Sequence, residues 1–259
     1  MASDFMAGLR ENLIAYLSTL SVMPGVAIEE MENLMRAATG VPAAFMNPVV
    51  TTGVISDIQR YVSETDLFFK DRGLPYAWYD LRDAHSASLN DHLLECGAIF
   101  CAEMPGMAVP LCDIEQDLEP VPDLEIIVAG DSEMPMWNEI TADVYDVAES
   151  VQADYSRFMI RVNQIPEMKC YVGLLNDVPV ATAMMLYSPN AAGIYSVAAL
   201  PEARNKGIGA AITRRTMLDA RSDGYPMAVL EASQMGCSVY RRLGFQEYCK
   251  VGLYIKLRS

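Results

Sequence analysis

The stretch "SVAALPEARNKGIGAAITRR", residues 196–215, is where an apolar run ends and a helical pattern begins. Two glycines, Gly207 and Gly209, and two basic residues, Arg204 and Lys206, stand at this junction. The first turn of a helix has backbone N–H groups without intrahelical partners, and the helix dipole adds positive charge there. Glycines let an anion approach these groups. The stretch therefore predicts a strand, a phosphate-binding loop and a helix, in that order.

Three interpretations of this loop are open from the glycine spacing alone. A dinucleotide fingerprint needs G-x-G-x-x-G, but Ile212 stands where the third glycine belongs. A Walker A loop needs Gly-Lys followed by Ser or Thr, which is absent here. The third interpretation is a helix start that binds no ligand.

The context of the loop resembles the GNAT superfamily of N-acyltransferases. Arg204-x-x-Gly207-x-Gly209-Ala210 matches the family's acetyl-CoA signature, [RQ]-x-x-G-x-[GA]. Some thirty residues downstream, "LEASQMGCSVYRRLGFQEY" is similar to a second family block. The positions that match this block are Tyr240, Leu243, Gly244 and Phe245. The resemblance covers about half of the chain.

The second half of the chain has the predicted order β-α-α-β-β-β-α-β-α-β-β, which is too mixed for a doubly wound sheet. The resemblance implies an α+β, three-layer GNAT fold with a mixed, splayed central sheet. The first half has the predicted order α-α-β-α-β-α-β, with a helix over 28–40. A final pair of strands is expected over 245–257.

The first half is expected to form a smaller α/β N-terminal lobe. Residues 67–81 and 93–109 look like the degenerate N-terminal half of two-lobed GNAT proteins, and an unrelated α+β cap is the alternative. We predict an N-terminal lobe over 1–112, a linker over 113–123 and a GNAT domain over 124–259. The linker region is acidic, contains prolines and shows no periodicity. It is alternatively interpreted as an internal loop of one domain.

The resemblance implies transfer of an acetyl group from acetyl-CoA to an amine, without a metal. It implies that Tyr240 is the general acid, and Glu231 is our first candidate for the general base. The alternative bases are Glu139, Asp143, Glu149 or a chain of water molecules. The residues expected to bind acetyl-CoA are Val197, Ala199, Arg204, Asn205, Lys206, Gly207, Ile208, Gly209, Ala210 and Ser233. Ser233 lies near the position where many family members have an Asn.

The acceptor is expected to be a small-molecule or peptide amine. Phe68, Phe69, Tyr76 and Trp78 either line an acceptor pocket or form part of a core. The predicted function is that of an N-acetyltransferase (acyltransferase class). The alternative is a catalytically inactive acyl-CoA-binding module that regulates or binds a partner.

The composition narrows the choice of partners. The formal net charge of −15 repels phosphate backbones, so we expect no nucleic acid partner. The six cysteines form no CxxC pair and there are only two histidines, so we expect no metal site. No segment approaches about 18 consecutive apolar residues, so no membrane span is expected. We expect a cytoplasmic protein that is a monomer or a homodimer.

Overall fold

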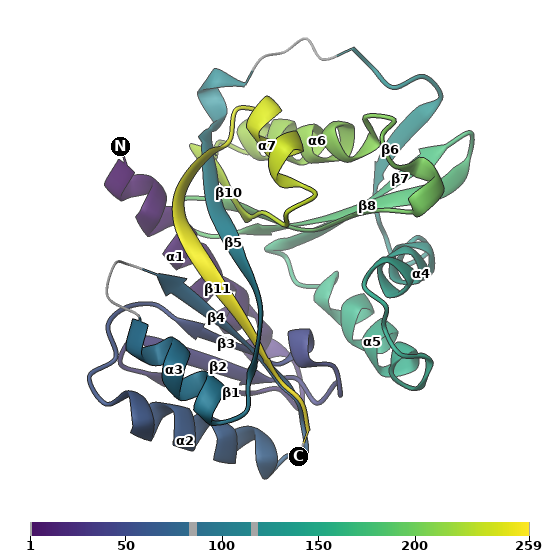
Figure 1. Ribbon diagram of the computed structural model, residues 1–259. Helices are drawn as coiled ribbons and strands as arrows, with labels where there is room; N and C mark the ends of the chain where they lie inside the picture. The colour runs from purple at the N-terminus through teal and green to yellow at the C-terminus, as the bar shows by residue number, and fades with distance from the viewer. Residues whose placement is uncertain (1, 83–86, 115–118, 259) are drawn as a thin grey trace. The chain divides into compact units, whose positions relative to one another are not determined.

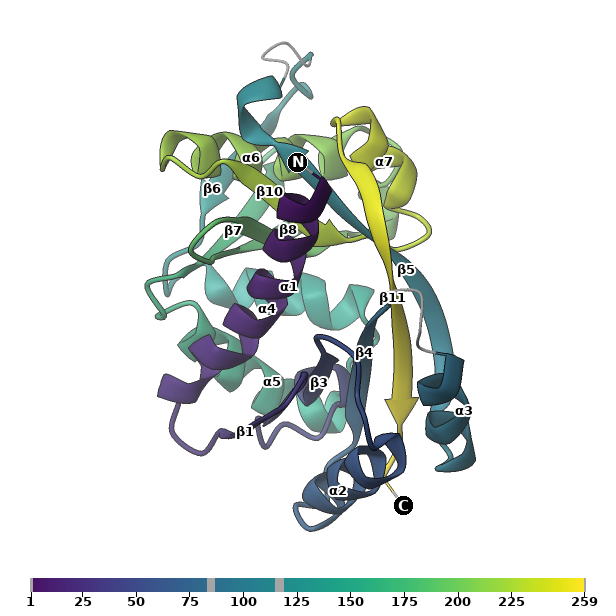
Figure 2. The same cartoon turned by 90° about the vertical axis from the view of Figure 1, so that its left-hand side faces the viewer.

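The computed structural model describes residues 2–82, 87–114 and 119–258. The chain packs into two compact units that alternate along the sequence, and Figures 1 and 2 show their elements. The large unit comprises Met1–Asn12 and Met107–Tyr248, and the small unit comprises Leu13–Gly106 and Cys249–Ser259. Three elements belong in part to both units: α1 (Ala2–Thr19), β5 (Ile99–Pro110) and β11 (Gln246–Lys256).

The large unit contains a mixed sheet in the order β10-β9-β8-β7-β6. These strands are β6 (Leu124–Val128), β7 (Met168–Leu175), β8 (Val178–Tyr187), β9 (Ala192–Ala199) and β10 (Met227–Glu231). Strands β6 to β9 pair antiparallel with their neighbours, whereas β9 and β10 are parallel. Asn176 and Asp177, at φ of 51° and 63°, form the turn between β7 and β8.

Helices cover both faces of this sheet, which gives the predicted three layers. Figures 1 and 2 show α6 (Ile208–Ser222) and α7 (Cys237–Arg242) on one face, and α4 (Met134–Val144) and α5 (Glu149–Val162) on the other. On the α6 face, Ile208 and Ile212 lie in the apolar core with Tyr171. On the opposite face, the indole N–H of Trp137 donates to the Ala183 carbonyl over 3.1 Å. The α+β fold expected from the sequence is confirmed.

The start of the chain is part of the large unit because Asn12 of α1 makes a buried hydrogen-bond network there. The Asn12 amide donates to Ser188 Oγ over 2.9 Å, and its Oδ1 accepts from the Tyr195 hydroxyl over 2.6 Å. A Cβ on Gly193 would come within 1.8 Å of Asn12 Oδ1, so the glycine makes room for this side chain. Glycine at position 193 thus allows α1 to pack against the start of β9.

The small unit has strands in the order β1-β2-β3-β4-β11, with β3 and β4 parallel and the other pairs antiparallel. Its other elements are β1 (Ala27–Met31), β2 (Leu34–Ala38), β3 (Pro48–Thr51), α2 (Ile58–Lys70), β4 (Tyr76–Arg82) and α3 (Ala87–Glu95). Helices α2 and α3 pack on the core of this sheet through Val62, Phe69 and Leu93.

The prediction of a helix over 28–40 is wrong, because these residues form the β1–β2 hairpin. Glu29 lies opposite Arg36 in the strand register, and their side chains form an ion pair. Arg36 is buried and donates to Thr65 Oγ1 over 2.9 Å. Asn33 has a φ of 59° in the turn. Glu29 and Arg36 are therefore cross-strand partners, and Asn33 is a turn residue.

The predicted final pair of strands is also wrong, because residues 246–256 form the single strand β11. Gly252 remains in strand register opposite Asp80 and forms no turn. The domain boundaries at 112 and 124 stay a prediction. In the predicted linker, Ile114 packs into the core of the large unit, and Val121 lies 3.4 Å from the position of a Cβ on Gly207.

None of the helices in the described ranges combines the length and the apolar character that a membrane crossing requires.

Candidate functional site

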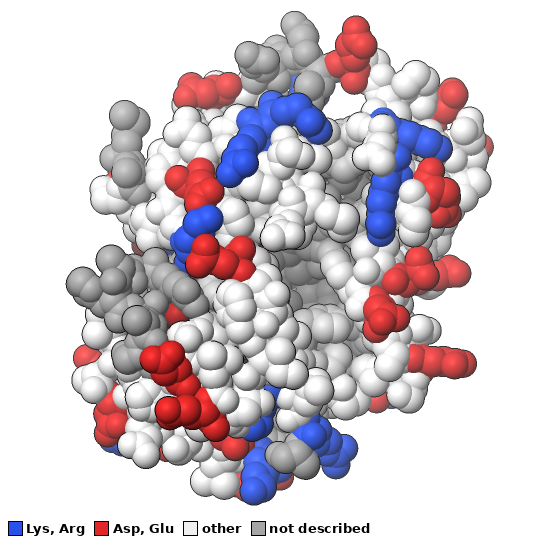
Figure 3. Space-filling model, viewed as in Figure 1, with Lys and Arg blue, Asp and Glu red and all other residues white. Residues whose placement is uncertain are grey.

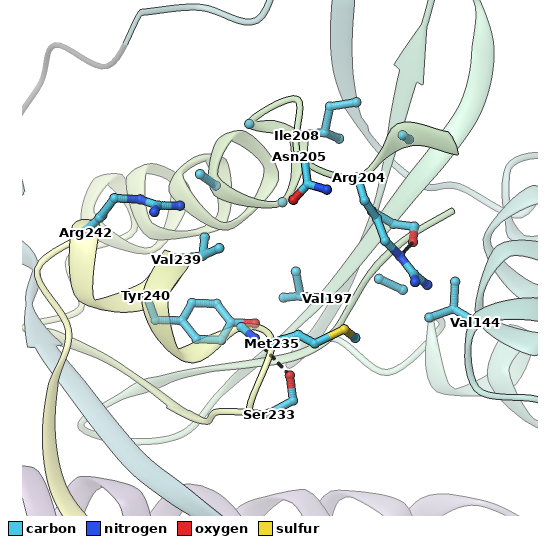
Figure 4. A pocket seen from close by; sticks show the side chains of 17 residues that line it. Val144, Val197, Arg204, Asn205, Ile208, Ser233, Met235, Val239, Tyr240 and Arg242 are labelled. Carbon is cyan, nitrogen blue, oxygen red and sulfur yellow. Dashed lines mark hydrogen bonds between the residues drawn. The ribbon is translucent and has the colours of Figure 1, made fainter. Parts of the chain in front are cut away.

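A cavity of about 570 Å³ opens in the large unit between the end of β9, the start of α6 and the helix α7. Figure 4 shows its side chains. The cavity is lined by Val144, Val197, Ala198, Ala199, Ala203, Arg204, Asn205, Gly207, Ile208, Gly209, Ala210, Ser233, Met235, Gly236, Val239, Tyr240 and Arg242. The structure thus brings together every residue predicted to bind acetyl-CoA except Lys206.

The cavity follows a separation between two parallel strands. Among the described residues, β9 and β10 pair only at Ala192–Ala228 and Gly193–Val229. Farther along β9 the register with β8 shifts, and Ser196 has a φ of 49°. A bulge of this kind bends a strand and interrupts its pairing. The β10 side of β9 from Ile194 onward is therefore available to hydrogen-bond an extended ligand.

The loop before α6 has the geometry of an anion cradle. Gly207 has a φ of 81°, which is the left-handed region that favours glycine. The first hydrogen bond of the helix runs from Ala211 N to Gly207 O, so the N–H groups before Ala211 have no partner within the helix. A Cβ on Gly209 would meet no atom within 4 Å, because it would point into open space.

Basic side chains surround this cradle. Arg204 and Arg242 are exposed and line the cavity from its two sides, as Figure 4 shows. The Arg204 Nε donates to the Ala199 carbonyl over 3.1 Å, which ties the loop to the end of β9. Lys206 is exposed but is not a lining residue. Figure 3 shows Lys and Arg side chains on the surface that carries α6 and α7, in a chain of net charge −15.

Tyr240 reaches from α7 into the cavity, and its hydroxyl points toward Met235 and Val197 (Figure 4). The side chain is 9% exposed, and its ring meets the Phe245 ring edge-on at a centroid distance of 5.9 Å. Burial raises the pKa of Tyr240 to about 12. The phenol is therefore protonated at neutral pH and can donate a proton to a group in the cavity.

Glu231 ends β10 at the opening between the two strands, but it does not line the cavity. Ala228 and Leu230 pack into the core beneath α6. Because successive side chains of a strand point to opposite faces, Glu231 faces away from α6. Burial raises the pKa of Glu231 to about 7, so this carboxyl exchanges its proton near neutral pH. Tyr240 and Glu231 thus stand on opposite sides of the opening.

The other candidate bases lie outside the cavity. Glu139 and Asp143 are exposed on α4, and Glu149 is exposed in the first turn of α5. None of the three is a lining residue. The lining residues that the sequence did not predict are Val144, Ala198, Ala203, Met235, Gly236, Val239 and Arg242. Arg242 lies one helical turn after Val239 on α7, so helical spacing pairs these two lining residues with each other. Val144 lies on α4, far from the motif in sequence, and has no local signal.

The small unit has a strand–helix–strand crossover of its own, from β3 through α2 to β4, but its helix start differs. Asp57 precedes α2, and its carboxylate accepts a hydrogen bond from Arg60 N over 3.2 Å. A carboxylate on these N–H groups competes with an anion and repels it. The start of α2 is therefore closed where the start of α6 is open.

The aromatic residues considered for an acceptor pocket lie in the core of the small unit. Phe68, Phe69, Tyr76 and Trp78 are buried in one apolar cluster, which confirms the core interpretation. The Trp78 indole donates to Thr51 Oγ1 over 2.6 Å. Phe69 and Tyr76 also border a separate cavity of about 260 Å³ beside Lys256 and Arg258. Across the described parts of the chain, no three His, Cys, Asp or Glu side chains are grouped to hold a metal ion.

The chain was compared with protein-family models, curated proteins and solved structures. Residues 125–248 match the family model described as acetyltransferase (GNAT) domain. A search of curated proteins gave no significant match.

Solved structures with a similar fold include a GCN5-related N-acetyltransferase from Kribbella flavida, at 18% identity and a TM-score of 0.71, covering 95% of each chain. A GCN5-related N-acetyltransferase from Sphaerobacter thermophilus has 14% identity and a TM-score of 0.64, covering 99% of this chain and 93% of that one. A tandem GNAT protein from the clavulanic acid biosynthesis pathway has 11% identity and a TM-score of 0.63, and the match covers 100% of this chain and 95% of that one.

Proposed function

Because residues 125–248 match the family model of the acetyltransferase (GNAT) domain, we propose that this chain transfers an acetyl group from acetyl-CoA to the amine of a small molecule or a peptide. One observation carries the proposal. The separation of β9 from β10 leads directly to an open helix start lined by Gly207 and Gly209. A strand edge and an adjacent anion cradle suit a ligand with an extended amide chain and a pyrophosphate.

The residues of the cavity fit acetyl-CoA in this arrangement. The N–H groups at the start of α6 hold the pyrophosphate, with Arg204 and Arg242 beside it. The backbone of Val197 and Ala199 hydrogen-bonds the pantetheine. A Cβ on Gly209 would enter open space, so the glycine leaves this approach clear.

Bound acetyl-CoA supplies a thioester whose acyl carbon is attacked by a neutral amine. Glu231 accepts the proton that the amine loses, directly or through water, because its pKa of about 7 suits a general base near neutral pH. Tyr240 donates its phenolic proton to the departing sulfur. The proton passes from a group of pKa about 12 to a thiolate, so the tyrosine is the weaker acid and the step depends on close placement.

A ligand comparison and a turnover assay test the proposal. CoA at about 100 times its Kd adds about 2.7 kcal/mol of stability, which corresponds to a rise in Tm of about 5–10 °C for a protein of this size. ATP and NAD at the same concentration are expected to give smaller shifts. Acetyl transfer to a panel of primary amines then tests catalysis. CoA binding without turnover on any amine would favour an inactive acyl-CoA-binding module, and a larger shift with ATP or NAD would favour a nucleotide-binding protein.

A further inference from the structure

The small unit holds a cavity of its own, of about 260 Å³, where α2 and β11 end and β4 begins. Three cations and one carboxylate stand in its lining, in a chain of net charge −15. Figure 3 shows Lys and Arg side chains on the surface near the C-terminal end of β11. The volume lies below the range of about 300–1,000 Å³ that is typical of pockets for drug-sized molecules, so the cavity suits a smaller ligand. It is lined by Asp66, Phe69, Lys70, Gly73, Leu74, Tyr76, Lys256, Leu257 and Arg258.

The end of α2 does not need these cations as caps. The carbonyls of residues 67–70 all accept hydrogen bonds, either from the backbone of the following turn or from the Arg72 side chain. Within the ranges that the structure describes, neither Lys70 nor Arg258 forms a hydrogen bond or an ion pair through its side chain. Both charges therefore remain available to an anion.

The other contacts of the cations place them at the cavity. A Cβ on Gly73 would lie 3.1 Å from Arg258 Nη2 and 3.4 Å from Cζ, so the guanidinium lies directly against this glycine. The Lys256 ammonium donates to the carbonyl of Cys96, just after α3. An ammonium has three donors, so Lys256 keeps two for a ligand.

The inner wall adds a hydroxyl donor and an apolar surface. Tyr76 is 2% exposed, and its hydroxyl lies 3.5 Å from Asp66 Oδ1, which is long for an O–H···O hydrogen bond. Burial raises the pKa of Tyr76, so the hydroxyl stays protonated at neutral pH. The side chains of Phe69, Leu74 and Leu257 supply the apolar part of the lining. The cavity thus combines cations for charged groups with a surface for a short carbon chain.

We propose that this cavity binds a small aliphatic dicarboxylate. The Arg258 fork pairs with one carboxylate through two parallel N–H···O bonds, and Lys70 and Lys256 pair with the other. A monocarboxylate would leave part of this charge unpaired, and inorganic phosphate has no carbon chain to cover the apolar side chains. The proposal is independent of the proposed function, because the cavity beside α6 is lined by residues of the large unit.

Calorimetric titration with succinate at constant ionic strength tests the proposal. Arg258→Gln and Lys70→Gln should each weaken succinate binding by at least about fivefold, because each removes charge-assisted hydrogen bonds. The control Arg60→Gln removes the same charge from an exposed residue of α2 outside the lining and should change the Kd by less than about twofold. An absence of succinate binding, or an equal loss of affinity in Arg60→Gln, would overturn the proposal.

Further arms of the same titration test the ligand class and the location. Butyrate and inorganic phosphate should each bind at least about fivefold more weakly than succinate, and phosphate binding as tight as that of succinate would overturn the dicarboxylate assignment. Arg204→Gln, at the start of α6, should leave the Kd for succinate unchanged within about twofold. A loss of succinate binding in Arg204→Gln alone would assign the anion to the large unit and overturn the proposal.

A resonance of the cavity itself gives a readout that does not depend on the affinities of the variants. In protein labelled with ¹⁵N-arginine, the Arg258 Nε–H resonance is assigned as the one missing from Arg258→Gln, and that of Arg60 in the same way. Succinate should shift the Arg258 resonance and leave the Arg60 resonance in place. An Arg258 resonance that stays unshifted at saturating succinate would overturn the proposal.

Discussion

Tyr240 is the residue on which the proposed chemistry depends most, because its hydroxyl points into the cavity from a buried ring. Tyr240→Phe removes only the proton donor and keeps the contact with Phe245. We expect kcat for acetyl transfer to fall by about 10²- to 10⁴-fold, as for other general acids, while CoA affinity changes little. Steady-state kinetics beside calorimetric CoA binding measure both. Near-normal kcat in Tyr240→Phe would reduce the residue to a packing role.

Glu231 makes the proposed reaction and the stability depend on pH. Its pKa is raised to about 7 by burial, so with one acceptor amine kcat/KM should rise with pH through an inflection near 7. Glu231→Gln should remove this inflection. An inflection that persists in Glu231→Gln would show that another group, or the amine itself, is responsible.

The same residue affects the free energy of unfolding. The folded carboxyl holds its proton more tightly than the unfolded one, whose pKa is near 4.5, so this group lowers stability as the pH rises from about 4.5 to about 7. In Glu231→Gln we expect a smaller loss of stability over that pH range, measured by urea unfolding.

At the residue scale, the sequence identified the cradle but only part of its surroundings. Gly207 and Gly209 could be recognised in the sequence because both features favour glycine. Gly207 has a positive φ, and Gly209 lies at the open start of the helix. The close approach of Gly236 to the Tyr240 ring depends on the fold of the turn before α7. No spacing rule reports such a contact, so it became visible only in the structure.

At the scale of single elements, the starts of α2 and α6 predict one CoA site per chain. The Asp57 carboxylate accepts a hydrogen bond from Arg60 N at the start of α2, whereas Gly207 carries no side chain to cap α6. We therefore expect a stoichiometry of one CoA per chain in calorimetry. Asp57→Ala should lower the free energy of unfolding by about 1 kcal/mol through the lost helix cap and leave CoA affinity unchanged. Two equivalent sites, or a weaker CoA affinity in Asp57→Ala, would contradict this assignment.

Most elements of the large unit follow from hydrophobic periodicity and turn residues, as the β7–β8 turn at Asn176-Asp177 illustrates. The β1–β2 hairpin does not follow from hydrophobic periodicity, because its second strand, Leu34–Ala38, is buried along its whole length. A fully buried strand lacks the alternation that distinguishes it from a buried helix. Its Arg36 is satisfied by Glu29 and Thr65, and these partners are distant in sequence or on another element.

At the scale of the whole molecule, the two units alternate along the chain, and each comprises two separate segments. The boundaries predicted at 112 and 124 divide the chain into consecutive segments and do not describe this alternation. Contacts far apart in sequence decide this arrangement, such as those of Asn12 with Ser188 and Tyr195. Asn12→Ala should lower the free energy of unfolding by about 1–3 kcal/mol, because it leaves buried polar groups without partners. Urea unfolding followed by circular dichroism measures the change, and a stability equal to that of the unchanged chain would argue against a structural role for α1 in the large unit.

The central claim is that the start of α6 binds the pyrophosphate of CoA, and Gly209 tests it most directly. A side chain there meets no protein atom within 4 Å and the φ is not in the left-handed region, so Gly209→Ala and Gly209→Val should fold normally. Calorimetric titration with CoA should show an affinity at least tenfold weaker in Gly209→Val, equivalent to about 1.4 kcal/mol, and an intermediate value in Gly209→Ala. An unchanged CoA affinity in folded Gly209→Val would contradict the account.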